Sequence, residues 1–185
     1  AFIMVPREAV AEAMRQCVEK KVITATVYSD GFAETGDEGR RMQAEVMKIA
    51  QEGGVRVLGP NCIGILSIRP SLALSVNAVL EMDSIKPGPF AIVSQSGSMT
   101  GGLLSRGLGR GVGFSKLISV GNEADIGVGE LTDMLVDDPN TGAILLFLET
   151  LRDADRLGHA ARRAYAANKP VIVYKLGRSD LGQDL

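Results

Sequence analysis

The residues with the clearest potential for chemistry follow a short apolar run in the middle of the chain. Residues 90–98 read Phe-Ala-Ile-Val-Ser-Gln-Ser-Gly-Ser, which predicts a buried strand, a turn of small residues and then a helix from Met99. The free amides and positive dipole end of a helix N-terminus attract anions, and Ser96, Gly97 and Ser98 leave room for one to approach. The pattern predicts a phosphate site, although an ordinary turn with serine as the helix N-cap fits the same residues.

Two further groups of polar residues have alternative interpretations. Gly59-Pro60-Asn61-Cys62 ends another apolar run and fits either a simple turn or part of a binding loop. Glu149 emerges from a third apolar run, where a carboxylate is either solvated or placed to orient a partner. The single histidine, His159, falls within an expected helix over residues 153–167, and a lone helical histidine favours a structural role.

Two familiar motifs do not fit the chain. Glycines at 107, 109, 111 and 113 resemble a dinucleotide fingerprint, but they follow an expected helix and precede a strand, which is the wrong order. Ser96 lacks the glycine two residues before it that a hydrolase nucleophile elbow requires, and no second histidine is present as a base.

Alternating short apolar runs and amphipathic stretches predict the elements that position these residues. The alternation is typical of an α/β protein with parallel strands joined by helical crossovers. Strands are expected at residues 2–5, 22–27, 55–58, 90–93, 115–120, 143–148 and 171–175. Helices are expected near residues 10–18, 42–50, 99–108, 128–135 and 153–167. The predicted fold class is α/β, with two doubly wound parallel-sheet units.

A break in the pattern separates the two units. No clear period holds over residues 63–86, and Lys86-Pro87-Gly88-Pro89 predicts a boundary, so we expect domains over residues 1–86 and 87–185. In the second domain, polar and glycine-rich residues follow the strands at 94–98, 121–123, 149–150 and 177–179. Open α/β sheets bind ligands at the carboxyl ends of their strands, so these loops form the candidate site.

Composition narrows the class of protein further. A length of 185 residues, 45% hydrophobic content and a mean hydropathy of +0.13 predict a soluble globular protein. A net charge of -2 with interspersed charges and 4% aromatic residues argues against nucleic acid, and no apolar run is long enough to span a membrane. Cys17, on a helical apolar stripe, is predicted to be core. With Cys62 and one histidine it forms neither a zinc pattern nor a disulfide framework, so we expect a cytoplasmic location.

Several motifs in order resemble a known family. The matching segments are residues 55–64, 92–98, 113–125, 137–140, 146–149 and 170–179. On these motifs the chain resembles the NDP-forming acyl-CoA synthetases, which share their architecture with the α subunit of succinyl-CoA synthetase. The resemblance covers nearly the whole chain. It implies a partial Rossmann-like CoA-binding domain followed by a flavodoxin-like ligase domain.

The resemblance implies a reversible phosphoryl relay. Family members convert acyl-CoA and phosphate into an acyl phosphate and CoA, pass the phosphoryl group to a histidine, and then pass it to ADP or GDP. The implied cofactors are coenzyme A, ATP or GTP with their diphosphates, and Mg²⁺. The nucleotide and Mg²⁺ would bind in an ATP-grasp domain or subunit, so we assign no metal ligand here. The implied partners are a small carboxylic acid or acyl-CoA, phosphate and that ATP-grasp part, in an oligomer.

The same resemblance implies roles for individual residues. CoA would face strand-end positions in the first domain, namely Val5, Pro6, Ser29, Gly31, Asn61 and Cys62. Of these, Asn61 and Cys62 would lie near the phosphate and the CoA thiol. Ser96, Gly97 and Ser98 match the helix N-terminus that holds the transferred phosphoryl group. Glu149 matches the catalytic carboxylate that orients the phosphorylated histidine.

Two departures from the family pattern affect what the chain can do alone. The opening Ala-Phe-Ile-Met-Val resembles a strand in mid-fold, after the strand and glycine loop with which the family grips the nucleotide part of CoA. The chain is therefore expected to be a fragment whose CoA affinity is weakened or lost. The family's phosphorylated histidine lies beyond the segment that matches Gly177-Arg178-Ser179, and His159 does not match it. We expect no turnover from this chain by itself.

Two other classes of function compete with the ligase interpretation. Some relatives fuse these domains to a protein acetyltransferase, where they act as a CoA- or nucleotide-binding regulatory module without ligase chemistry. A generic nucleotide- or metabolite-binding α/β protein is the second alternative. The number and order of the motifs favour the ligase over both.

Overall fold

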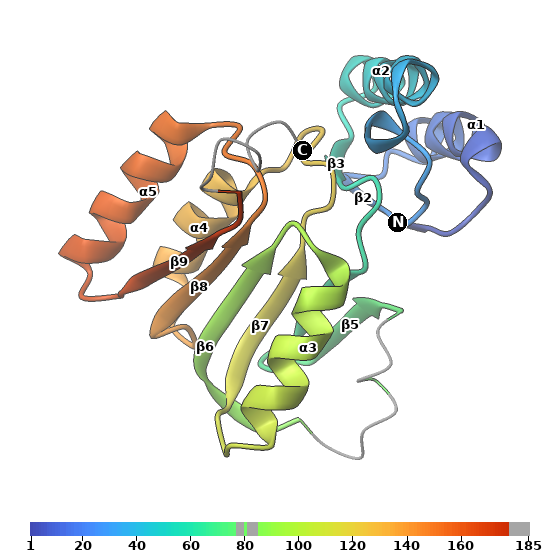
Figure 1. Ribbon diagram of the computed structural model, residues 1–185. Coiled ribbons are helices and arrows are strands. Elements are labelled where there is room, and N and C mark those ends of the chain that lie inside the picture. The colour runs from blue at the N-terminus through green and yellow to red at the C-terminus, as the bar shows by residue number, and fades with distance from the viewer. Residues whose placement is uncertain (77–79, 81–84, 178–185) are drawn as a thin grey trace. The chain divides into compact units, whose positions relative to one another are not determined.

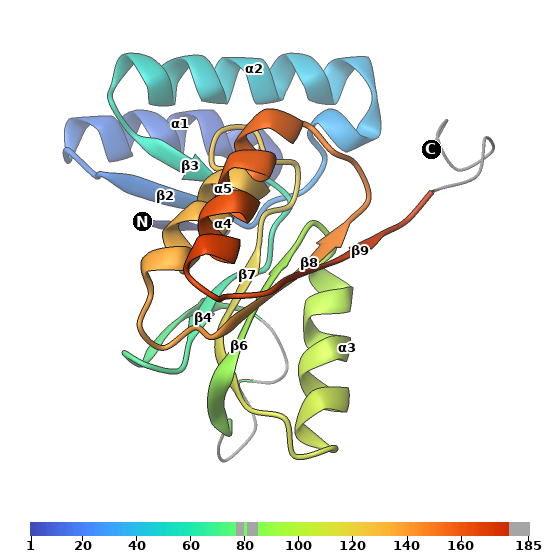
Figure 2. The same ribbon diagram turned by 90° about the vertical axis from the view of Figure 1, so that its left-hand side faces the viewer.

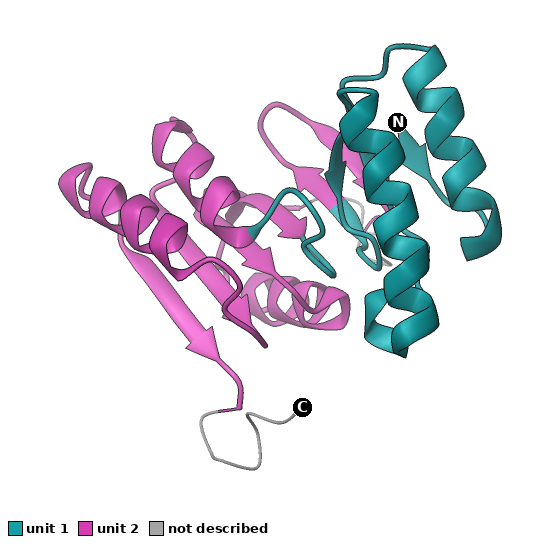
Figure 3. Cartoon of the chain, turned by 90° about the horizontal axis from the view of Figure 1, so that it is seen from above, with its two compact units in different colours: residues 1–64, 120–127 teal, residues 65–119, 128–185 magenta. Residues whose placement is uncertain are grey.

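The computed structural model describes residues 1–76, 80 and 85–177. They form two compact units, Ala1–Gly64 with Val120–Gly127, and Ile65–Ser119 with Val128–Leu185 (Figure 3). The segment Val120–Gly127, which lies within the second expected domain in the sequence, thus belongs to the first unit. The expected loop residues Arg178 and Ser179 lie outside the described residues.

A short parallel sheet carries the first unit. Its elements are β1 (Phe2–Ile3), α1 (Arg7–Glu19), β2 (Thr24–Val27), the 3-10 helix η1 (Ala33–Thr35), α2 (Asp37–Glu52) and β3 (Arg56–Leu58). The strands pair in the order β1-β2-β3. Both helices cover the same face of this sheet and pack against each other (Figure 2), as expected when successive right-handed crossovers run in one direction.

The core of the first unit lies between these helices and the sheet. Val10, Met14 and Cys17 recur at helical spacing along α1 and are all buried. They pack with Val27 of β2 and Val57 of β3, whose side chains are fully buried. The prediction that Cys17 is a core residue is therefore confirmed.

The second unit is built on a larger sheet. Its elements are β4 (Gly64–Ser67), β5 (Leu72–Ser75), β6 (Pro87–Ser94), α3 (Gly97–Leu108), β7 (Phe114–Ser119), α4 (Val128–Asp137), β8 (Ala143–Leu148), α5 (Ala154–Ala166) and β9 (Val171–Lys175). Among the described residues the strand order is β5-β4-β7-β6-β8-β9. The expected parallel core is confirmed, since β6, β7, β8 and β9 all pair in parallel.

Helices cover both faces of this sheet. α3 packs on β6 and β7, while α4 and α5 pack together on the opposite face (Figure 1). From β6 the chain moves outward to β7, crosses back over β6 to β8 and continues to β9. The crossover direction therefore reverses between β6 and β8, which is the topological switch point where open α/β sheets bind ligands.

The segment without a clear period contains two strands that the pattern did not predict. β4 pairs antiparallel with β7, so the sheet is mixed at this edge. Leu72 and Leu74 of β5 are exposed, and the four-residue strand therefore lacks an alternation of buried and exposed positions. By contrast, β8 and β9 coincide with the strands expected at 143–148 and 171–175.

A partly buried ion pair gives the second unit a pH-dependent contribution to stability. Asp138, 13% exposed, accepts hydrogen bonds from Lys116 Nζ (2.5 Å) and Thr141 Oγ1 (2.5 Å). Burial alone would raise the pKa of Asp138, but these hydrogen bonds outweigh burial and hold the pKa below its usual value. Because the folded-state pKa is lowered, the stabilisation is present above the unfolded-state pKa near 3.9 and is lost as the pH falls through the folded value.

We expect Asp138→Asn to lower the free energy of unfolding by about 2 kcal/mol at neutral pH, because Lys116 loses its charged partner. The difference from wild type should shrink as the pH falls from about 4 through the lowered folded-state pKa, where the wild-type carboxylate also becomes protonated. Chemical denaturation across this pH range measures both effects. Asp137→Asn is the control, since the exposed Asp137 pairs with Arg163 and surface ion pairs contribute little. A difference that grew at low pH would contradict the prediction.

Candidate functional site

The turn after β6 is shaped by its own serines. The Ser94 hydroxyl accepts a hydrogen bond from Ser96 N (3.1 Å) and donates to Ser96 O (2.7 Å). Ser96 is the N-cap of α3, and its Oγ accepts from Met99 N (3.4 Å). The Thr100 amide and hydroxyl both donate to Ser96 O, which starts the helical hydrogen-bond pattern. The local interactions of the turn thus fix the direction in which α3 leaves the sheet.

The first turn of α3 offers donors to an anion. In the part of the chain that the structure describes, no hydrogen bond uses the amides of Gly97 or Ser98, the first two helical residues. The hydroxyl oxygens of Ser96 and Ser98 lie 3.1 Å apart at the same terminus. No acidic residue occupies this first turn. The three predicted phosphate-binding residues therefore present amides, hydroxyls and a positive dipole end together.

Gln95 links this turn to the loop after β8. Its Oε1 accepts hydrogen bonds from the amides of Glu149 (2.5 Å) and Thr150 (2.8 Å), and its Nε2 donates to Thr150 O (2.9 Å). The backbone nitrogen of Gln95 donates to Phe147 O (3.1 Å), and the Gln95 side chain is buried. Sequence reasoning missed this role. The available signal was an amide side chain placed directly after an apolar run, where a buried polar group needs several partners.

Glu149 and the α3 terminus line one cavity of about 500 Å³. Ser96 and Glu149 are its polar residues, and its apolar wall comes from α3, β8 and β9, including Met99, Phe147 and Tyr174. The Glu149 backbone carbonyl accepts a hydrogen bond from Lys175 Nζ (2.7 Å), which fixes the loop from a third side. Within the described residues, the Glu149 carboxylate itself has no hydrogen bond or ion pair. It is therefore available to orient a donor that enters the cavity.

The first unit brings its predicted positions together at the carboxyl ends of its strands. Ser29, after β2, donates its hydroxyl to Val5 O (2.5 Å), after β1. Asn61, after β3, donates its amide to Ser29 O (2.9 Å) and has φ = 57°, a left-handed conformation that asparagine tolerates. Hydrogen bonds thus connect the ends of all three strands. Such strand ends are where α/β sheets bind their ligands.

Two protein-family models match the two parts of the chain that carry the loops described above. A model of the CoA binding domain matches residues 1–67, and a model of the succinyl-CoA ligase like flavodoxin domain matches residues 87–185, more than half of the chain. The chain belongs to the succinyl-CoA ligase-like family. Both matches agree with the motifs that carried the resemblance in the sequence.

Individual relatives of this succinyl-CoA ligase-like chain are named as CoA ligases and synthases. The α subunit of an ADP-forming acetate–CoA ligase II from Pyrococcus furiosus is 37% identical over 98% of this chain and 38% of its own length. Trans-feruloyl-CoA synthase FCS1, from an unknown prokaryotic organism, is 35% identical over 100% of this chain and 26% of its own length. The chain thus spans well under half the length of these relatives.

A solved structure supports the same fold. The dinucleotide-forming acetyl-coenzyme A synthetase 1 of Ca. Korarchaeum cryptofilum, in complex with phosphate and ADP, superposes with a TM-score of 0.87. It is 33% identical, and the match covers 98% of this chain and 38% of that one. The expected α/β class with CoA-binding and flavodoxin-like parts is therefore confirmed for the ligase-like chain.

The structure restricts what Cys62 can do in the ligase-like chain. Its thiol is 2% exposed and faces the backbone carbonyls of Val27 (3.4 Å) and Leu58 (3.7 Å). Burial raises the pKa of the Cys62 thiol to about 11. The predicted contact of Cys62 with CoA would therefore have to use the backbone, because the sulfur points into the protein.

We expect Cys62 to resist alkylation in the folded protein. At about pH 8 the raised pKa alone should slow its reaction with iodoacetamide about hundredfold relative to an ordinary cysteine, since the thiolate is the nucleophile. Mass spectrometry of tryptic peptides after timed labelling measures the rate, and labelling in denaturant is the control. Rapid labelling of Cys62 in the native protein would contradict its burial.

His159 lies away from the cavity of the ligase-like domain. Its Nδ1 is 3.9 Å from the Asp133 carboxylate across the α4–α5 layer, on the face of the sheet opposite α3. The described residues contain no group of three or more His, Cys, Asp or Glu side chains arranged to hold a metal ion. Among the same residues, no helix is both long enough and apolar enough to cross a membrane.

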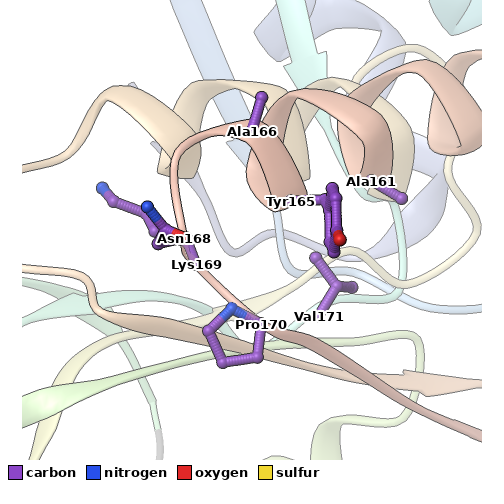
Figure 4. Close-up of a pocket in the computed structure, with 7 residues that line it drawn as sticks. All are labelled: Ala161, Tyr165, Ala166, Asn168, Lys169, Pro170 and Val171. Carbon is purple, nitrogen blue, oxygen red and sulfur yellow. The ribbon is translucent and has the colours of Figure 1, made fainter.

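A second hollow lies at the other end of β9. It has a volume of about 640 Å³ and is lined by the end of α5 and the connection to β9, including Tyr165, Asn168 and Lys169 (Figure 4). Lys169 Nζ already donates to the carbonyls of Asp138 (2.7 Å) and Leu135 (3.4 Å). This hollow is at the amino end of β9, whereas the predicted site residues lie at carboxyl ends.

Proposed function

We propose that the full-length protein is an NDP-forming acid–CoA ligase. It interconverts acyl-CoA, NDP and phosphate with a carboxylate, CoA and NTP through an acyl phosphate and a phosphohistidine. The observation that carries this proposal is the shared cavity of the α3 N-terminus and Glu149, at the switch point of a domain that matches a ligase family. An anion site and a carboxylate that has no partner among the described residues suit, in one cavity, phosphoryl transfer through an oriented imidazole.

The residues of the α3 terminus would hold the phosphoryl oxygens. The amides of Gly97 and Ser98 donate to them, and the Ser96 and Ser98 hydroxyls add two further donors. These donors are fixed before the substrate arrives, because the serines and Gln95 determine the shape of the turn. Preorganised donors stabilise charge that develops during transfer without reorganisation at that moment.

Glu149 would orient the histidine rather than bind phosphate, because a carboxylate repels an anion. Its carboxylate accepts the N–H of one imidazole nitrogen, which leaves the other nitrogen unprotonated and facing phosphorus. The N–P bond forms as the P–O bond of the acyl phosphate breaks, and the carboxylate product leaves. The histidine comes from a part of the protein outside this chain, since His159 lies on the opposite face of the sheet.

The remaining components follow from the same assignment. Coenzyme A faces the strand ends of the first unit, around Val5, Pro6, Ser29, Gly31 and Asn61. The sequence assigns residues 1–86 to the CoA-binding domain; the family match supports residues 1–67 of it, while β4 and β5 pack in the second unit. Residues 87–185 form the ligase domain. ATP or GTP and Mg²⁺ bind in an ATP-grasp domain or subunit, and the complete enzyme is a cytoplasmic oligomer. The named relatives are ligases and a synthase, which does not favour an acetyltransferase regulatory module.

The test is to incubate the full-length protein with ATP, Mg²⁺, CoA and a panel of carboxylic acids, and to identify products by mass spectrometry. Formation of acyl-CoA with ADP and phosphate supports the relay and names the acid. Formation of AMP and pyrophosphate overturns it. Measurable CoA binding without acyl-CoA from any acid would instead support the regulatory module.

A further inference from the structure

The segment Val120–Gly127 belongs to the first unit and lies beside β3 and the loop that follows it, although it stands between β7 and α4 in the sequence. Alternate residues of the segment donate backbone hydrogen bonds along the β3 side: Asn122 to Pro60 O (2.9 Å), Ala124 to Gly59 O (3.0 Å) and Ile126 to Val57 O (3.0 Å). These three bonds satisfy backbone carbonyls of β3 and of the loop after it. The segment therefore runs beside the loop that carries Asn61.

Two features hold the segment close to that loop. The Asp125 carboxylate accepts hydrogen bonds from Val57 N (2.8 Å) and from two nitrogens of Arg56 (2.9 and 3.1 Å). Gly121 has φ = 56°, and a Cβ there would lie 2.2 Å from Pro60 O. Only glycine permits this approach, which places the following residue, Asn122, against the strand-end loops.

The Asn122 side chain connects both loops that face the proposed CoA site. Its Nδ2 donates to Glu34 Oε2 (2.5 Å) and to Gln43 Oε1 (3.0 Å). Its Oδ1 accepts from Asn61 Nδ2 (3.4 Å). One amide thus reaches the loop after β2, the helix α2 and the loop after β3. These partners are side chains near the surface rather than core residues.

Glu34 connects the Asn122 side chain to the backbone of the loop after β2. Its Oε1 accepts hydrogen bonds from Gly31 N (2.7 Å) and Phe32 N (3.1 Å), which fold the loop after β2 around the carboxylate. Burial alone would raise the pKa of Glu34, but the hydrogen bonds from Asn122 and these amides hold it below its usual value. Glu34 is therefore ionised at neutral pH, and its second oxygen depends on the N–H donor of Asn122.

We propose that Asn122 is a positioning residue for coenzyme A. It sets the spacing between the loop of Ser29 and Gly31 and the loop of Asn61, and so determines the shape of the CoA-facing edge without touching the reacting atoms. The inference rests on the proposed function, because it assigns CoA to this edge. It adds a determinant from a segment that lies within the match to the ligase domain rather than the CoA-binding one.

The test exchanges donor and acceptor between Asn122 and Glu34 in the full-length protein. Asn122→Asp removes both N–H donors and places a second carboxylate against Glu34, so the two loops should separate. In the double variant Glu34→Gln/Asn122→Asp, the new glutamine can donate to the new aspartate and still accept from Gly31 and Phe32. Asn168→Asp, the same change in the second unit outside any predicted site, is the matched control.

We expect the single variant to raise the Kd for CoA, measured by calorimetry, about tenfold, equivalent to about 1.4 kcal/mol. The KM for CoA should rise with it while kcat stays nearly unchanged, and the double variant should recover most of the affinity. Unchanged CoA affinity in Asn122→Asp would overturn the inference. The inference would also be overturned if the double variant unfolded at the same temperature as wild type but did not recover the CoA affinity that Asn122→Asp had lost. Failure of the wild-type protein to bind CoA would refute the proposed function instead.

Discussion

Glu149→Gln is expected to reduce turnover of the full-length protein in the proposed ligase reaction by at least about a hundredfold, the scale of an acid–base contribution to catalysis. The substitution keeps the size of the side chain and its backbone hydrogen bonds to Gln95 and Lys175. It removes the negative charge that would fix the imidazole tautomer and stabilise the charged ring. Steady-state formation of acyl-CoA from ATP, CoA and the identified acid measures the loss.

Measuring the two partial reactions separately distinguishes an orienting role of Glu149 from a general structural defect. Formation of acyl phosphate and CoA from acyl-CoA and phosphate does not require the histidine, so Glu149→Gln should leave that exchange largely intact. Acid-labile phosphorylation of the protein should become slow. Glu52→Gln is the control, because Glu52 lies at the exposed end of α2 and only loosely faces Lys48 at 3.9 Å. Equal loss of both steps in Glu149→Gln would contradict an orienting role.

The sequence predicted the parallel elements well because their signals are local. β6 is a continuous apolar run whose Ala91, Ile92 and Val93 are fully buried, which is typical of a central parallel strand. The turn of Ser96–Ser98 was also predictable, since small residues after such a strand and before a helix define a helix N-terminus. Its role as a phosphate site stays a prediction that the proposed experiments test.

Long-range side-chain contacts could not be predicted in this way. Gln95 contacts residues more than fifty positions away, and Asn122 contacts Glu34 at 88 positions' separation. Polar residues that connect loops follow no regular spacing in the sequence. The sequence therefore shows which residue is polar but not which residues it contacts. The burial of Cys62 could not be predicted from the sequence for a related reason. A cysteine after Gly-Pro-Asn faces solvent or core according to the turn geometry, which composition does not determine.

Gln95→Leu is expected to lower turnover about ten- to a hundredfold, because a displacement of catalytic groups by about an ångström has effects of this size. Leucine fills a similar volume, but it leaves the amides of Glu149 and Thr150 and the Thr150 carbonyl without the partner that now fixes them. The Glu149 loop should then move relative to the α3 terminus, with a loss of about 1–3 kcal/mol in the free energy of unfolding.

Gln95→Glu separates positioning from stability. A carboxylate at this position can still accept from the two amides, but its second oxygen faces Thr150 O, where Gln95 now donates. At neutral pH this variant should show an activity between those of wild type and Gln95→Leu. As the pH falls and the new carboxyl group gains a proton, it can donate to Thr150 O, so its activity relative to wild type should rise. Gln95→Leu has no group to protonate and should show no such recovery. If both variants responded equally to pH, the hydrogen bonds of Gln95 would not be what holds Glu149 beside the N-terminus of α3.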